Sequence, residues 1–148
     1  MIIDKVLLDN LTEQAKANPR LRQAMDLRNS PEDSSQRMLN ALEPGTIMPI
    51  HRHHGSSETV VILRGKIRWM FFDDNDNLLC KQSDQGRANP NEPTEEVILD
   101  ANGEVRMLNV ERNRWHSLEC LESAVLFETK NGAYQPLSLD EIMEIQNV

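Results

Sequence analysis

The chain has 148 residues, a length typical of one domain that buries a core without disulfides or a structural metal. It carries 24 acidic and 16 basic side chains, so its formal net charge is −8. This charge argues against sequence-independent binding to nucleic acid and against docking on an anionic membrane surface. Hydrophobic residues make up 39% of the chain, which is typical of a folded, soluble protein rather than a disordered one.

The apolar runs are short, and the four residues 60–63 form one of the longest. None approaches the ~18 residues that a membrane helix needs. The first residues lack a basic segment followed by a long apolar one, so we predict no signal peptide. Cys80 and Cys120 both lie in apolar, strand-like context, where we expect two reduced thiols rather than a disulfide. These features predict a cytoplasmic protein.

The N-terminal segment has the pattern of a helix. Apolar residues recur there at helical spacing: Leu7, Leu8, Leu11 and Ala15. Asp4 is suited to cap the first turn, and Asn18-Pro19 ends the pattern, so we predict a helix over 4–17. The following segment, up to residue 35, has weak periodicity and a turn-rich end, and we expect it to lie across the domain surface.

Short apolar segments separated by turn signals occupy the middle of the chain. We predict strands at 37–43, 57–64, 66–72, 78–83, 95–100, 104–110, 116–120 and 123–130. Many short strands at this spacing predict an antiparallel sandwich or barrel. The segment 84–95 is too long and too polar for a tight hairpin, so we expect a loop there.

The segment after Pro136 has the pattern of a short helix, with Ser138 and Glu141 placed as a capping box. The whole chain is then one domain. It consists of an N-terminal helix and surface arm at 1–35, a β-barrel at 36–136 and a C-terminal helix at 137–148.

The four histidines are the residues whose placement points to chemistry. In an extended segment alternate side chains share a face, so His51 and His53 point one way and His54 the other. Glu58 begins the next predicted strand, and His116 lies 65 residues after His51. Taken singly, each histidine is explained equally well as a packed or exposed side chain without a function. The glutamate is likewise explained as a solvated strand residue. Taken together, imidazoles and a carboxylate favour a divalent transition metal.

The segment 45–65 resembles the first motif of the cupin superfamily. Each fixed position of that motif is matched: Gly45, His51, His53, Glu58 and Gly65. The second cupin motif is degenerate over 111–116 but retains His116. Asn113 stands where that motif has glycine, which predicts a left-handed backbone conformation there. The resemblance implies an all-β fold, the cupin double-stranded β-helix or jelly-roll barrel, with short N- and C-terminal helices.

Three further segments, 18–22, 36–45 and 127–134, resemble the WbuC family of cupin-fold metalloproteins. That family occurs with bacterial surface-polysaccharide biosynthesis. The resemblance implies that the metal ligands are His51, His53, Glu58 and His116. It also implies one divalent transition metal per chain, either Fe, Mn, Ni or Zn.

Other polar residues are candidates to line the same site. Arg64 shares the face of Glu58 by the period of two, and Glu128 and Lys130 share one face of their strand. Tyr134 is suited to stack against a sugar. Interior charges either pair with each other or meet a substrate carboxylate, phosphate or hydroxyl. Arg64, Glu128, Lys130 and Tyr134 are therefore the candidate catalytic residues.

These patterns lead to two main hypotheses on function. The first is a small metal-dependent isomerase, lyase or oxygenase that acts on a sugar, a nucleotide sugar or another small molecule. The second is a non-catalytic small-molecule-binding or regulatory cupin with a structural metal. A third is a vestigial metal site in a larger assembly. Long barrel edges and apolar terminal helices further predict a homodimer.

Overall fold

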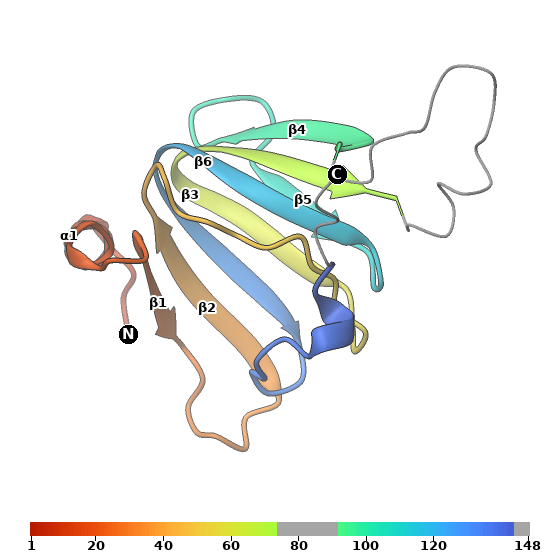
Figure 1. Ribbon diagram of the computed structural model, residues 1–148. Coiled ribbons are helices and arrows are strands. Elements are labelled where there is room, and N and C mark those ends of the chain that lie inside the picture. Colours follow the sequence, from red (N-terminus) through yellow and green to blue (C-terminus); the bar gives the residue numbers. More distant parts are fainter. Residues whose placement is uncertain (74–91, 144–148) are drawn as a thin grey trace.

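The computed structural model in Figure 1 shows one strongly curved β-sheet with a helix beside one edge. It describes residues 1–73 and 92–143. The elements are α1 (Lys5–Ala17), β1 (Arg22–Asp26), β2 (Ser35–Leu42), β3 (Glu58–Phe72), β4 (Glu95–Asp100), β5 (Met107–Val110), β6 (Trp115–Asn131) and the 3-10 turn η1 (Leu139–Glu141). Within these described ranges, no helix is both long and apolar enough to cross a membrane.

Helix α1 forms where its sequence predicts it. The Asp4 carboxylate caps the first turn by accepting a hydrogen bond of 2.9 Å from the Leu7 N–H. Leu11 and Ala15 are 2% and 0% exposed, and they pack on the outer face of the sheet against Leu39 and Val125. The predicted helix is confirmed, and burial of its apolar side holds it against β1, β2 and β6.

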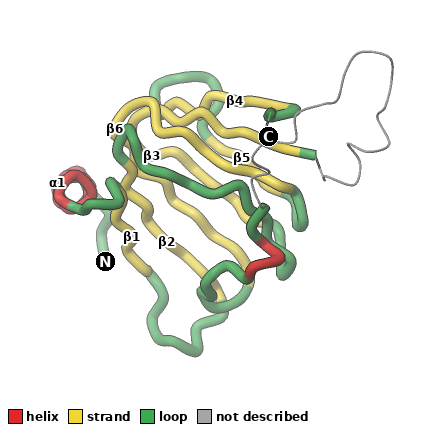
Figure 2. The backbone as a smooth tube through the Cα atoms, in the orientation of Figure 1, coloured by secondary structure: helices red, strands yellow, loops and turns green. Residues whose placement is uncertain are grey.

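The strands pair antiparallel in the order β1-β2-β6-β3-β4, and β5 also pairs with β3. The all-β prediction is confirmed. The predicted closed barrel is wrong, because no ladder in the described residues joins the two edge strands β1 and β4, and the sheet stays open. Figure 2 shows the segment between β2 and β3 running across the curved sheet to η1, where the Arg52 N–H bonds to the Glu141 carbonyl at 3.0 Å.

Two pairs of predicted strands are single long strands. The segments 57–64 and 66–72 form β3, and 116–120 and 123–130 form β6. The turn signal at Gly65 makes an irregularity instead of a hairpin, since the β3–β6 register shifts between Ile62 and Ile67. Gly65 has φ +77°, and a Cβ there would lie 2.0 Å from the Ser123 carbonyl oxygen. The close approach of the two backbones therefore requires glycine.

Other segments differ from the prediction. Strand β1 lies inside the predicted surface arm and pairs with β2, with Arg22 opposite Leu42. In the described part of the predicted C-terminal helix, residues 137–143, the chain forms one 3-10 turn and then an extended Ile142, which bridges to His51; residues 144–148 lie outside the described residues. The predicted strand 78–83, with Cys80, lies outside the described residues, as does most of the predicted loop 84–95. Cys120 is free and buried.

The concave inner face of the sheet carries the candidate site. Across β3 and β6 the register pairs are Glu58 with Lys130, Val60 with Glu128 and Ile62 with Leu126. Directly paired residues point to the same face. Glu128 and Lys130, predicted to share one face of their strand, therefore lie on the face of Glu58. Beyond them an apolar cluster that includes Val60, Ile62 and Leu126 fills the inner face.

Candidate metal centre

A backbone bridge brings the two distant histidine segments together. The His51 N–H donates to the His116 carbonyl at 2.9 Å, and the His116 N–H donates to the His51 carbonyl at 2.8 Å. The two rings consequently lie with their centroids 4.3 Å apart, and the ring of His53 lies 5.1 Å from His51 and 5.7 Å from His116. Trp69 stacks on His116 at 5.3 Å, which limits rotation of that ring.

One nitrogen from each of the three rings could reach a common ion. Ring nitrogens of His51, His53 and His116 all lie within 4.8 Å of one another. A metal holds each imidazole nitrogen at about 2.1 Å, so two of its ligand nitrogens are at most about 4.2 Å apart. The 4.8 Å within which the three nitrogens lie is close to this limit, so small side-chain rotations at most would close the group around an ion.

The protonated nitrogen of two of these rings follows from their neighbours. His51 Nδ1 donates to the Pro49 carbonyl at 3.0 Å, and His116 Nδ1 donates to the Arg114 carbonyl at 2.9 Å. In a neutral ring the proton is then on Nδ1, and Nε2 keeps its lone pair. Burial lowers the pKa of His51 to about 3, so its ring is neutral at neutral pH. Such carbonyl contacts commonly orient metal-binding histidines.

Glu58 completes the predicted ligand set. Its side chain is 3% exposed, with Oε1 3.0 Å from His116 Nε2 and Oε2 3.3 Å from His53 Nε2. Burial by itself raises the pKa of Glu58, but the contacts with His116 and His53 outweigh burial and hold the pKa well below its usual range. The structure thus brings together all four residues predicted as ligands, with Glu58 ionised. Their role as ligands stays a prediction.

The contact between His116 and Glu58 tests whether a metal fits. His116 Nε2 is buried and makes no hydrogen bond among the described residues, although Glu58 Oε1 is 3.0 Å away. When the ring proton is on Nδ1, as the contact with the Arg114 carbonyl favours, Nε2 offers a lone pair beside a carboxylate oxygen, and a cation between the two atoms would bind both. This arrangement, with a donor set of imidazoles and one carboxylate, fits a divalent transition metal.

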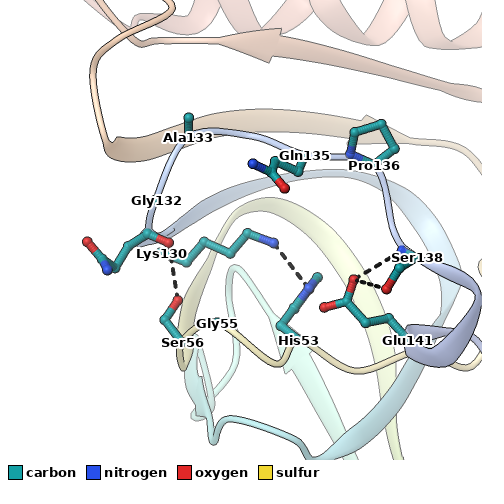
Figure 3. Close-up of a pocket in the computed structure, with 11 residues that line it drawn as sticks. His53, Gly55, Ser56, Lys130, Gly132, Ala133, Gln135, Pro136, Ser138 and Glu141 are labelled. Carbon is teal, nitrogen blue, oxygen red and sulfur yellow. Dashed lines mark hydrogen bonds between the residues drawn. The ribbon is translucent and has the colours of Figure 1, made fainter.

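A cavity of about 300 Å³ opens beside the histidines. Figure 3 shows Lys130 extending across it toward His53, with Nζ 3.1 Å from Nδ1. The lining residues are His53, Gly55, Ser56, Lys130, Asn131, Gly132, Ala133, Gln135, Pro136, Ser138 and Glu141. Since His53 belongs both to the cavity lining and to the three-histidine group, the cavity adjoins the candidate metal centre on one side.

Glu128 lies deeper on the same face, within a group of polar side chains. Its carboxyl group accepts hydrogen bonds from Asn40 Nδ2 at 3.1 Å and from Gln36 Nε2 at 3.4 Å. Burial and the neighbouring charge of Glu58 raise the pKa of Glu128 to about 7, although Lys130 opposes the shift. Gln36 and Asn40 were not predicted as site residues. Their signal was two amide side chains at even spacing, which places them on one face of the strand.

Arg64 and Tyr134 are not placed at the histidines. Arg64 forms an ion pair with Asp9 of α1 at 2.8 Å, because the irregularity around Gly65 interrupts the alternation of β3. Tyr134 is 51% exposed and does not line the cavity, although both of its neighbours in sequence do. Their catalytic role remains a prediction without a contact to support it.

His54 has partners of its own outside the three-histidine group. Its ring contacts Asn113 Oδ1 at 2.7 Å and Asp140 at 3.1 Å. Asn113 has φ +67°, which confirms the left-handed conformation predicted from its place in the motif. His54 thus connects the loop of the second motif to the C-terminal segment.

Comparison with known proteins identifies the family. A family model described as "Domain of unknown function (DUF6016)" matches residues 3–83, which is more than half of the chain. The chain belongs to the DUF6016 family. The matched span contains His51, His53 and Glu58 and ends before His116. A search of the curated proteins found no match to this DUF6016 chain.

Solved structures show the cupin fold. Oxalate oxidase in complex with the substrate analogue glycolate has a TM-score of 0.56 and 13% identity over 78% of this chain. The capsular polysaccharide assembling protein CapF from Staphylococcus aureus has a TM-score of 0.57 and 19% identity over 80% of this chain. A cupin superfamily protein from Desulfitobacterium hafniense has a TM-score of 0.51 and 16% identity over 74% of this chain and 76% of its own. The DUF6016 chain spans 53% of the oxalate oxidase and 30% of CapF, so these two similarities concern part of a larger protein.

Proposed function

We propose that this DUF6016 protein binds one divalent transition metal (Fe, Mn, Ni or Zn) through His51, His53, Glu58 and His116. The observation that carries the proposal is the 3.0 Å contact between His116 Nε2 and Glu58 Oε1, which has no hydrogen-bond geometry. A cation between these two atoms would give a partner to both the buried ring nitrogen and the carboxylate. The resemblance to the WbuC family supports the same four residues.

We further propose that the protein is a small metal-dependent enzyme, an isomerase, lyase or oxygenase. A five- or six-coordinate metal held by these four residues would keep at least one open position, which would supply polarisation of a carbonyl group or activation of water or dioxygen. The cavity at His53 admits a small molecule to that position. Glu128, with a pKa of about 7, is able to give or take a proton on the same face.

For the substrate, we propose a sugar, a nucleotide sugar or another small polar molecule of surface-polysaccharide biosynthesis. The support is the WbuC resemblance and the fold shared with CapF, a capsular polysaccharide assembling protein. The polar side chains of Ser56, Asn131 and Gln135 in the cavity suit hydroxyl groups.

The second candidate function is a non-catalytic binding or regulatory protein with a structural metal. The burial of two proposed ligands favours it, because the side chains of His116 and Glu58 are only 1% and 3% exposed and a metal between them is shielded from solvent. The two functions differ in turnover. A screen of sugars, nucleotide sugars and short carboxylic acids against protein reconstituted with each metal separates them, and conversion of one compound with one metal establishes the enzyme.

Metal analysis tests the ligand set directly. Protein purified without an affinity tag is expected to contain about one divalent ion per chain, and His51→Ala and His116→Ala are expected to lose it. His54→Ala is the matched control, because His54 lies outside the three-histidine group. Circular dichroism confirms that each variant is folded. Full metal content in the folded His116→Ala variant would overturn the assignment.

A further inference from the structure

Lys130 is a cation that faces the cavity without a carboxylate partner. Its Nζ contacts both ring nitrogens of His53, at 3.1 Å to Nδ1 and 3.5 Å to Nε2. In the part of the chain that the structure describes, it forms no salt bridge. An ammonium group only donates hydrogen bonds, so the nearer nitrogen Nδ1 acts as the acceptor.

Metal binding at His53 is incompatible with this contact, whichever ring nitrogen is the ligand. If the metal binds Nε2, the ring proton moves to Nδ1, and a donor then faces the ammonium group. If the metal binds Nδ1, it takes the place that Lys130 occupies. In both cases Lys130 leaves His53, and its charge becomes available to another partner.

A divalent ion at the histidines makes the surroundings of the cavity more positive by two charges. Glu141 at the cavity wall is negatively charged, but its carboxylate is held by hydrogen bonds from Ser138 and from the His54 N–H, and within the described residues it forms no salt bridge with Lys130. The metal-loaded cavity therefore favours a negatively charged ligand more strongly than the metal-free cavity does.

The size and lining of the cavity limit that ligand. Ligand pockets commonly have volumes of about 300–1,000 Å³, so a cavity of about 300 Å³ lies at the small end of that range. Around Lys130 it offers the side chains of Ser56, Asn131 and Gln135 as neutral hydrogen-bonding groups. These dimensions suit a small hydroxylated acid or phosphate rather than a whole nucleotide sugar.

We propose that the cavity is a binding site for a small oxyanion, a carboxylate or a phosphate, whose charge pairs with Lys130 once a metal has released this side chain from His53. This inference rests on the proposed function and deepens it. It specifies that the ligand is anionic and that the metal binds before the ligand. Lys130 is then the residue that selects charged over neutral ligands.

Calorimetric titration tests the site with glycolate for the carboxylate arm and inorganic phosphate for the phosphate arm. Mn²⁺ loading is measured first on the same protein. Mn²⁺-loaded wild-type protein is expected to bind at least one probe at least tenfold more tightly than metal-free protein does. Lys130→Met is expected to weaken that binding at least tenfold, and Lys130→Arg to retain it within a few-fold. Lys66→Met is the matched control, since Lys66 pairs with Asp100 and Glu122.

The release step has its own measurement. Lys130→Met is expected to bind Mn²⁺ several-fold more tightly than wild type, because no contact with His53 has to break and one repelling charge is gone. Equal or weaker Mn²⁺ binding by Lys130→Met would overturn the release. Two results would overturn the oxyanion site alone. In the first, wild-type protein loads Mn²⁺ but binds neither glycolate nor phosphate. In the second, Lys130→Met binds a probe as tightly as wild type does. Failure of wild-type protein to load any of the four metals would overturn the proposed function and this inference together.

Discussion

Replacement of Glu128 by glutamine tests the electrostatics of the inner face. Glu128 accepts hydrogen bonds from Asn40 and Gln36, and its carboxyl group lies beside that of Glu58. Burial and the charge of Glu58 raise its pKa from 4.5 to about 7. Glutamine has nearly the same shape and no charge, so Glu128→Gln removes the titration and keeps the packing.

The sign and size of the effect follow from the two pKa values. Below pH 4.5 the carboxyl group is protonated in both the folded and the unfolded chain. Between pH 4.5 and 7 only the folded chain holds the proton, so stability falls as the pH rises, and the loss is complete above pH 7. A shift of about 2.5 pKa units corresponds to about 3 kcal/mol. The new amide turns one donor toward Asn40 or Gln36 at a cost of about 1 kcal/mol. Metal-free Glu128→Gln is thus expected to be about 2 kcal/mol more stable than wild type at pH 8, but about 1 kcal/mol less stable at pH 4.5.

The assay is urea unfolding of metal-free protein in EDTA at pH 4.5, 6 and 8. His51 has a pKa lowered to about 3 in the folded chain, so its contribution to the free energy of unfolding is lost as the pH falls below 6.5. This loss is the same in wild type and in Glu128→Gln. Glu119→Gln is the control, because Glu119 lies on the same strand but is exposed and pairs with Arg68 at the surface. A difference between Glu128→Gln and wild type that does not change with pH would refute the argument.

Two further predictions concern the fold. Gly65→Ala is expected to lower the free energy of unfolding by more than about 2 kcal/mol, because its Cβ would meet the Ser123 carbonyl at 2.0 Å and φ is +77°. Gly55→Ala has open space around it and is expected to be near neutral, so equal urea midpoints for the two variants would contradict the explanation. Leu11→Ala is expected to cost about 2–5 kcal/mol, since the side chain is 2% exposed. Val6→Ala, on the same helix and 65% exposed, is expected to cost less than about 0.5 kcal/mol, and equal losses would show that α1 is not packed as described.

Local patterns in the sequence determined much of this protein. The capped helix and most strand positions were predictable, because capping and alternation act over a few residues. The His51–His53 pair and Glu58 were recognisable from their spacing, and the positive φ of Asn113 was predicted from its place in the resembled motif. Alternation also predicted that Glu128 and Lys130 share one face of their strand.

Only the tertiary structure decided which of these residues meet. The irregularity at Gly65 joins two predicted strands and sends Arg64 to α1, because the close approach of Ser123 from β6 fixes the register there. Strand β1 and the open sheet depend on pairing between distant segments, which no local pattern encodes. The contact of Lys130 with His53 likewise depends on the register between β3 and β6. The sequence named the residues of the candidate centre, and long-range register determined their contacts.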